Sequence, residues 1–288
     1  MKHALAFALC LLWSASGLSA QESPYVVTYD HHLEEPGNLE IEASGTLGAP
    51  RSGSFYFAPY IEVEYGVTAR WTAELYLEGQ ATAGDSGVFT GWRLENRFRP
   101  LKREHWINPI LYFEYEGLNE ATRIGKEIVG NAHPSRESNA VLSKVPAHEI
   151  ETKLILSSVI HDWNLAGNFI VEKNLSAAEG FEFGYAAGVS RPLATLASSD
   201  ACRWCRENFS VGVEVYGGLG GTNGFGFRQT SHYLAPVVAW QVSSNSTLKF
   251  SPGFGLTQLS NPVLLRFGYS YELRGFGTQV AQWLGGKP

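Results

Sequence analysis

Apolar and polar side chains alternate along most of this 288-residue chain, in segments of about ten residues. In the run 55–65 (FYFAPYIEVEY) the odd positions are apolar or aromatic, and the even positions carry Tyr, Ala and Glu. This alternation places successive side chains on opposite faces of a β-strand and does not fit the spacing of a helical stripe. Strands are therefore the predicted elements.

The same pattern predicts twelve strands. They cover 38–46, 54–65, 70–80, 88–98, 108–117, 148–158, 163–174, 181–190, 208–217, 232–242, 246–257 and 262–273. Strands of this length can cross an outer membrane when tilted, and an even number of strands with short turns on one side is typical of bacterial outer-membrane barrels. Connections 99–107 and 191–207 are longer than that pattern expects. We predict an all-β fold, a single transmembrane antiparallel up-and-down β-barrel of about twelve strands.

A secreted two-sheet sandwich would also alternate. Its polar face meets bulk water and is usually rich in Lys, Thr and Asp, whereas the polar positions here hold Glu, Tyr, Gly, Asn and a few Arg. The apolar face carries aromatic residues near strand ends, as in the aromatic girdle of a membrane barrel. These residues are Trp71, Trp92, Trp163, Tyr65, Phe98, Tyr115 and Phe209. The barrel is the favoured interpretation.

The N-terminus has the features of a secretory signal. Met1-Lys2-His3 is a short positive start, and 4–16 is an apolar run too short to span a bilayer as a helix. We predict a signal peptide over 1–20, a periplasmic N-terminal arm over 21–37, the barrel over 38–273 and a C-terminal tail over 274–288. The predicted location is the outer membrane of a Gram-negative bacterium after cleavage of the signal.

Two short motifs carry a resemblance to known barrels. The segment 65–71 (YGVTARW) is similar to the Tyr-Gly-Leu-Thr-Asp-Arg-Leu type of hairpin in a broad group of proteobacterial and acidobacterial outer-membrane barrels, described as transporter-like or MetA-pathway-of-phenol-degradation-like proteins. The segment 266–273 (RFGYSYEL) resembles the recognition signal of the barrel-assembly machinery, with matches at Arg266, Gly268, Tyr271 and Leu273. That signal normally closes the chain, but here fifteen residues follow. The resemblance implies outer-membrane lipid and the assembly machinery as partners.

Charge helps to define the inner face. The chain has 22 Lys and Arg against 28 Asp and Glu, so it lacks the basic footprint of a nucleic-acid-binding protein. Alternation directs into the lumen Glu62, Glu64, Glu74, Glu78, Arg93, Glu95, Arg97, Glu114, Glu116, Glu149, Glu151 and Lys153, and also Glu40, Glu42, Arg70, Glu172, Glu182, Glu214, Lys249, Arg266 and Glu272. Fifteen carboxylates against six cations predict an acidic lumen with surplus negative charge.

Register arithmetic predicts cross-strand ion pairs on this inner wall. Opposed residues in an antiparallel pair have a constant sum of residue numbers. A sum of 171 for the second hairpin and of 134 for the first would pair Glu78 with Arg93, Glu74 with Arg97 and Glu64 with Arg70. Such a ladder would fix the register and fill the lumen, as side chains commonly do in small barrels.

The predicted function is a small channel or transport-associated porin for small neutral or cationic solutes. Its selectivity residues would include the surplus Glu114, Glu116, Glu149 and Glu151, and the long connection 118–147 could act as a constriction loop. Two alternatives remain open, namely a lipid-modifying enzyme of the outer membrane and a closed structural or adhesive barrel. The adjacent Ser231 and His232 would point to opposite faces of a strand, which does not favour an enzyme.

Two further groups of residues have side chains that could carry chemistry. Cys202 and Cys205 remain after signal cleavage, and a local disulfide in a periplasmic connection is expected rather than a redox motif. The segment 30–32 (DHH), with Glu34 and Glu35, could hold a metal, but a solvated segment before the first strand is the preferred interpretation. We therefore expect no cofactor and no metal.

Overall fold

The computed structural model describes residues 23–123, 128, 137–193 and 204–285. Its long strands are β1 (Leu39–Ala49), β2 (Tyr56–Thr68), β3 (Trp71–Thr82), β4 (Gly87–Phe98), β5 (Asn108–Asn119), β6 (Pro146–Ile160), β7 (Trp163–Asn174), β8 (Phe181–Pro192), β9 (Phe209–Gly221), β11 (His232–Ser243), β12 (Ser246–Gly255) and β13 (Val263–Leu273). All twelve predicted strands are present, which confirms the interpretation of the alternating pattern. A two-residue strand, β10 (Gly224–Phe225), extends β9 as a short hairpin.

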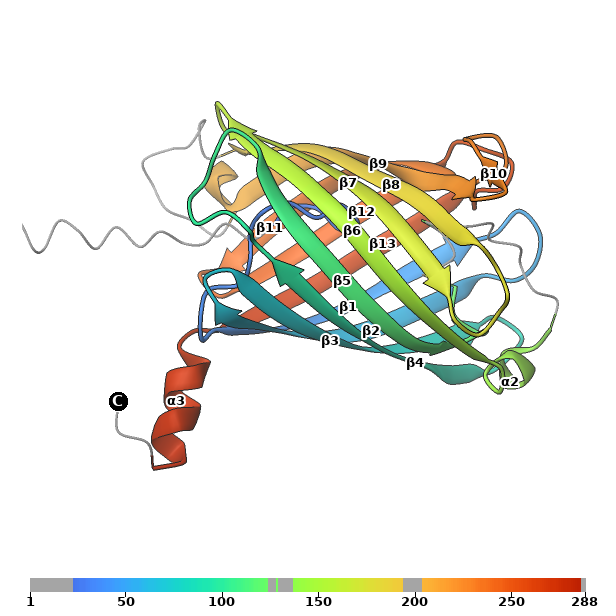
Figure 1. Cartoon of the computed structure of the whole chain (residues 1–288), viewed down its shortest axis with the longest axis horizontal. Coiled ribbons are helices and arrows are strands. Elements are labelled where there is room, and N and C mark those ends of the chain that lie inside the picture. Colours follow the sequence, from blue (N-terminus) through green and yellow to red (C-terminus); the bar gives the residue numbers. More distant parts are fainter. Residues whose placement is uncertain (1–22, 124–127, 129–136, 194–203, 286–288) are drawn as a thin grey trace, which may run out of the picture.

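Every long strand pairs antiparallel with its neighbours along the chain, and the last strand pairs with the first. The sheet therefore closes on itself, and the fold is the predicted up-and-down barrel (Figure 1). Closure removes the two edges that an open sheet of this size would expose. The chain enters and leaves the barrel at one end, which we call the terminal end; the opposite end is the loop end.

The tight turn between β6 and β7 is set by local backbone geometry. His161 and Asp162, the two residues of this turn, both have positive φ angles, of 49° and 67°. Two left-handed residues in succession form the turn whose twist matches that of the flanking strands, and Asp is among the residues that tolerate this conformation. Two residues therefore suffice to connect β6 to β7.

The two faces of the barrel differ in the way that the alternation predicts. Large apolar side chains are exposed on the outer face of most long strands, among them Ile61, Leu75, Leu94, Phe113 and Leu154. Most of the inward-facing Glu, Arg and Lys side chains are buried. No helix in the described parts of the chain has the length and apolar character needed to cross a membrane.

The predicted ion-pair ladder has the wrong register. Glu74 lies opposite Glu95, and Glu78 lies opposite Gly91, with a β-bulge after Glu78. In the first hairpin Glu64 lies opposite Glu74, and a second bulge near the turn places Arg70 outside the paired region, where it is exposed. The salt bridges at this wall are therefore diagonal rather than directly cross-strand, and Arg70 is not a lumen residue.

Two α-helices among the described residues lie outside the wall. Within the long connection 120–145, α2 (Asn139–Leu142) packs at the loop end, where the Asn139 backbone N–H donates to Asp85 at 2.6 Å. After β13, α3 (Phe276–Trp283) extends away from the terminal end (Figure 1). The Gly277 N–H donates to the Gly37 carbonyl at 2.8 Å, and the Gly275 N–H donates to Asn38 Oδ1 at 2.8 Å. The tail is thus joined to the residues that precede β1.

Candidate functional site: an acidic lumen with an internal arm

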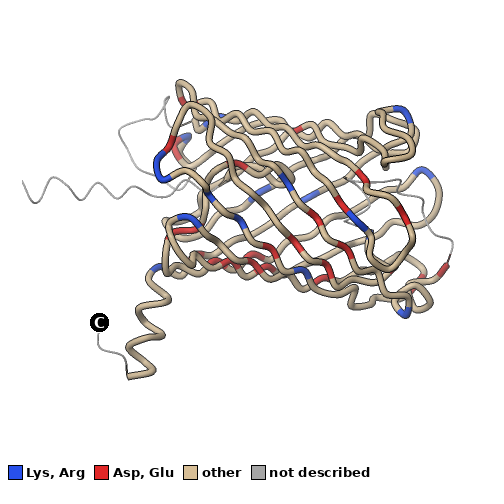
Figure 2. Tube along the Cα trace, in the orientation of Figure 1, with Lys and Arg blue, Asp and Glu red and all other residues tan. Residues whose placement is uncertain are grey.

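A continuous row of glutamates crosses nine neighbouring strands on the inner wall. Each member lies directly opposite the next one in the paired sheet. In order from β13 through β1 to β8 the row comprises Glu272, Glu40, Glu64, Glu74, Glu95, Glu114, Glu151, Glu172 and Glu182. We call this set the glutamate row. Figure 2 shows acidic positions recurring on successive strands of the barrel.

The glutamate row climbs from the terminal end to the loop end. Glu272 and Glu40 are one residue from the terminal ends of their strands, whereas Glu182 is one residue from the loop end of β8. Strands of such barrels tilt by about 35–45°, so directly opposed positions rise along the wall. Eight steps of ~4.8 Å at this tilt give a rise of roughly 25 Å, close to the thickness of a hydrocarbon core.

Residues 23–38, here called the arm, lie inside the lumen beside this row. The arm is anchored on Glu214 of β9, whose carboxylate accepts the backbone N–H groups of Val26, Val27 and Thr28 at 3.2, 2.9 and 2.6 Å. Glu214 is 0% exposed. Three successive N–H groups on one carboxylate form a compact anion site, and hydrogen bonds to a charged acceptor are among the strongest in proteins.

A second anchor holds the middle of the arm. The Asn168 side chain on β7 accepts the Tyr29 N–H at 2.8 Å and donates to the Tyr29 carbonyl at 2.7 Å, as a neighbouring strand would do. The Tyr29 hydroxyl donates to Glu95 at 3.0 Å, and its ring packs edge-on against Tyr112. Tyr29 therefore connects the arm directly to the glutamate row.

The segment 30–32 is buried rather than solvated, so the preferred expectation for it was wrong. Asp30 is 1% exposed; it contacts His32 Nδ1 at 2.9 Å and accepts from Asn164 Nδ2 at 2.6 Å. His31 Nδ1 lies 2.5 Å from Ser157 Oγ. Polar side chains of the arm thus find partners on β6 and β7, and these contacts dock the arm.

The loop-end half of the lumen on the opposite wall is apolar. Val27 of the arm packs in a buried cluster with Tyr216 and Tyr233, and Ile128 of the long connection packs against the same cluster. Tyr216 and Tyr233 stack with their ring centroids 5.3 Å apart. The arm and one residue of the long connection therefore meet the same apolar surface inside the barrel.

A cavity of about 360 Å³ opens at the terminal end. Its lining includes His32 and Glu34 of the arm, and Glu40, Glu64 and Glu272, which are the first three members of the glutamate row. A solvated space of this size accommodates several waters or a small solute. The part of the glutamate row at the terminal end is therefore accessible to solvent beside the docked arm.

The chain shares the fold of known outer-membrane channels. An outer membrane channel from Pseudomonas putida F1 matches with a TM-score of 0.54 at 12% sequence identity, over 86% of this chain and 100% of that one. The NanC porin matches with a TM-score of 0.49 at 12% identity, over 82% of this chain and 100% of that one. At such low identity the likeness shows the fold alone. No protein-family model matches the chain, and neither does any curated protein.

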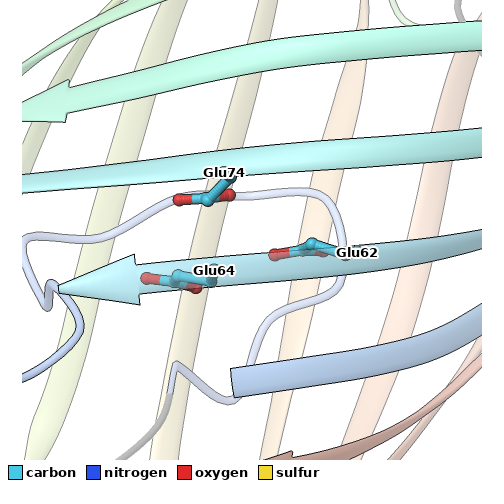
Figure 3. Close-up of side chains that lie close together, drawn as sticks. All are labelled: Glu62, Glu64 and Glu74. Carbon is cyan, nitrogen blue, oxygen red and sulfur yellow. The ribbon is translucent and has the colours of Figure 1, made fainter. Parts of the chain in front are cut away.

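Apart from Arg70, the predicted lumen residues lie on the inner wall. Buried among them are Glu74, Glu78, Glu95, Arg97, Glu114, Glu116, Glu151 and Lys153, while Glu62, Glu64, Arg93 and Glu149 are partly buried. Arg97 contacts Glu64 and Glu74, Arg93 contacts Glu78 and Glu114, and Lys153 contacts Glu151. Figure 3 shows Glu62 and Glu64 on β2 next to Glu74 on β3. Two of the predicted pairs, Glu78 with Arg93 and Glu74 with Arg97, are in contact, although not directly opposed, whereas Glu64 contacts Arg97 instead of Arg70.

The other predicted residues are placed as follows. Arg266 and Gly268 of the assembly motif are buried on β13, whereas Tyr271 is exposed on the outer face, and Leu273 is the last residue of the strand. A Cβ at Gly268 would lie 2.3 Å from Ser44 Oγ, so a larger residue would not fit there without movement. Cys205 is disulfide-bonded, and Cys202 lies outside the described residues.

Several functional residues were missed at the sequence level. Asn164, Asn168 and Ser157 are inward-facing polar residues that bind the arm, and a Cβ at Gly188 would lie 2.5 Å from the Tyr25 ring. The signal available in the sequence was a group of small or amide side chains at inward positions of β6 to β8. These side chains contrast with the glutamates of β2 to β5.

Ionisable groups of the arm predict a pH effect on its docking. Burial disfavours the charged form of His32, but the hydrogen bond and charge of Asp30 outweigh it and raise the His32 pKa above 6.5. Burial and the charge of Glu272 raise the pKa of Glu34 to about 7. Protonated His32 therefore stabilises the docked arm below pH 6.5. This contribution is lost as the pH rises through the raised pKa of His32. Because docking raises the pKa of Glu34, ionisation of Glu34 at higher pH also weakens docking.

We therefore expect the arm to loosen as the pH rises from about 5 to about 8, because the Glu34 contribution is lost between 4.5 and about 7 and the His32 contribution above 6.5. Hydrogen exchange at the amides of Val26 to Tyr29, corrected for the intrinsic pH dependence of exchange, measures this directly. His32→Gln should reduce the pH dependence. His148→Gln, which changes a histidine hydrogen-bonded to Tyr115 instead of to the arm, serves as the control. Equal protection of these amides at both pH values would contradict the assignment.

Proposed function

We propose that this chain is an outer-membrane channel for small cations and small neutral solutes, and that the arm closes its lumen. Membrane insertion is supported by the exposed apolar outer face and by aromatic residues at strand ends, such as Trp163 and Phe98. Such side chains are unfavourable in water and favourable in lipid. The shared fold is consistent with this location.

The glutamate row is the single observation that carries the proposed selectivity. Its carboxylates begin in the terminal cavity and reach the loop end, so they provide successive negative positions along the wall. Arg97, Arg93 and Lys153 contact only part of this set. Surplus negative charge in a confined lumen raises the local concentration of cations and excludes anions.

Planar-bilayer recordings in a KCl gradient test the selectivity. We expect K⁺ to be preferred over Cl⁻ by about tenfold or more, because a lumen of one charge sign concentrates counter-ions. The double variant Glu40→Gln and Glu272→Gln removes the two charges at the mouth of the row and should reduce this preference severalfold. Glu179→Gln, which changes an exposed residue outside the lumen, should leave the preference for K⁺ over Cl⁻ unchanged. A preference for Cl⁻ would contradict the proposal.

A closed structural barrel is the second candidate, because the arm and Ile128 pack against one apolar cluster inside the lumen. That arrangement could simply fill the barrel permanently. The two functions give different results after release of the arm. A channel gains conductance when the arm is released, whereas a closed barrel remains silent in the same recordings.

A further inference from the structure

We propose that Glu116, Glu149 and Glu172, supported by Glu114 and Glu151, form a binding site for one divalent cation of the hard, oxygen-preferring class, for which Ca²⁺ is the probe. The site lies on the inner wall of β5, β6 and β7, toward the loop end. It would join three neighbouring strands through one ion. The proposal concerns metal binding and does not depend on whether the barrel conducts.

The strand register brings these carboxylates together. Glu114 lies opposite Glu151, and Glu151 lies opposite Glu172; one step further along the inner face, Glu116 lies opposite Glu149. Two sets of three offer one carboxylate oxygen per residue, with all three oxygens within 4.8 Å of one another, and Glu116 belongs to both sets. Carboxylate oxygens are the ligands that hard divalent cations such as Ca²⁺ prefer, and Ca²⁺ tolerates a flexible ligand geometry. The donor set therefore suits this class of ion.

Glu116 provides the independent indication that a ligand is missing. Glu116 is only 4% exposed, and its Oε2 atom is buried without a hydrogen-bond partner among the described residues. Arg93 lies directly opposite Glu116, but its guanidinium contacts Glu78 and Glu114 instead. A buried carboxylate oxygen with no partner is costly, so a cation at this oxygen would be stabilising.

The neighbouring cations do not neutralise the cluster. Lys153 Nζ contacts Glu151 at 2.8 Å, and Arg93 Nη1 contacts Glu114 at 3.2 Å. Within the described ranges, no Lys, Arg or His forms an ion pair with Glu116 or Glu172. Glu149 accepts a hydrogen bond from the Asn174 side chain. The cations at the edge of the cluster are thus engaged with Glu151 and Glu114 and form no ion pair with Glu116 or Glu172 at its centre.

A second group of three glutamates shows what a neutralised cluster looks like. The carboxylate oxygens of Glu62, Glu64 and Glu74 also lie within 4.8 Å of one another (Figure 3). There the Arg97 guanidinium contacts both Glu64 and Glu74 and supplies the positive charge. This group has its cation in the chain itself, which makes it the natural comparison for the proposed site.

Calorimetric titration of Ca²⁺ into the full-length, refolded protein tests the proposal. The protein should be refolded in detergent free of lipopolysaccharide, because lipopolysaccharide phosphates bind Ca²⁺, and treated with a chelator before titration. We expect saturable binding of one equivalent, and a higher unfolding temperature with Ca²⁺ than with chelator. Glu116→Gln and Glu172→Gln should each weaken binding on the order of tenfold or more, since affinity follows the number of charged ligands.

The glutamine variants also have a signature that does not depend on binding. Each variant removes one charge from a repulsive cluster, so its unfolding temperature in chelator should be higher than that of the unmodified protein. Addition of Ca²⁺ should then produce no further rise in that temperature. Glu62→Gln, in the comparison group, should leave Ca²⁺ affinity unchanged. The proposal is overturned by absence of saturable binding up to millimolar Ca²⁺, by unchanged affinity in Glu116→Gln and Glu172→Gln, or by loss of binding in Glu62→Gln instead.

Discussion

Replacing Glu214 with alanine is expected to release the arm and increase conductance on the order of a hundredfold, through a larger open fraction. The substitution removes the acceptor of three backbone N–H groups, from Val26, Val27 and Thr28. Hydrogen bonds to a charged group contribute about 1.5–3 kcal/mol each, so loss of even two of them shifts the docking equilibrium by about 3 kcal/mol or more. When the arm leaves the lumen, the three N–H groups form hydrogen bonds with water. The released arm therefore has no unsatisfied donors at these positions, which favours release in the variant.

Planar-bilayer recording measures the conductance, and hydrogen exchange at the same three amides measures docking independently. Glu179→Ala is the matched control, since it makes the same change in charge at an exposed position of the β7–β8 connection. Faster exchange together with unchanged conductance would show that the arm is mobile but does not close the lumen. Faster exchange with no conductance in either protein would favour the closed structural barrel.

Replacing Arg97 with methionine is expected to destabilise the barrel by about 3–5 kcal/mol, the usual cost of leaving buried charges without their partner. Arg97 is 7% exposed and contacts Glu64 at 2.6 Å, Glu95 at 3.2 Å, and Glu74. Methionine fills much of the same volume, so the effect reports the charge rather than a cavity. Loss of folding yield in the single variant would be consistent with this expectation.

The double variant Arg97→Met and Glu74→Gln keeps the prediction testable when the single variant folds poorly. Removal of one uncompensated carboxylate should restore part of the stability, as measured by urea unfolding or by heat-dependent mobility on gels. Arg70→Met is the control, because Arg70 is exposed in the β2–β3 turn. Equal stabilities of Arg97→Met and the unmodified protein would contradict the assigned role of Arg97.

Alternation predicted the strands but could not fix their register. A shift of two residues keeps every side chain on the same face, so a register sum of 171 and the observed pairing of Tyr76 with Arg93, which sums to 169, satisfy the same pattern. The bulges near Glu78 and Gly66 each add an extra residue on one strand and so shift the register of the pairs beyond them. The glutamate row depends on these bulges and was therefore not predicted.

The docked arm was not predicted for a different reason. Its partners are distant in sequence, as in the contacts of Thr28 with Glu214 and of Tyr29 with Asn168. A segment without regular periodicity carries no local signal of its own, and each inward asparagine on a strand is equally compatible with a water-filled lumen. Long-range pairing of this kind becomes visible only when the barrel is closed.

The bonds between the tail and Gly37 determine how the arm can return after it has left the lumen. Because Gly277 and Gly275 hold residues 37 and 38 at the barrel rim, the arm can swing only about this fixed end. The fifteen residues from Ser23 to Gly37 reach at most about 50 Å when extended, enough to leave the lumen entirely while remaining attached. Reclosure is then a unimolecular step whose rate is independent of protein concentration, and a free peptide of the same sequence would have to be supplied at roughly millimolar concentration to compete with it.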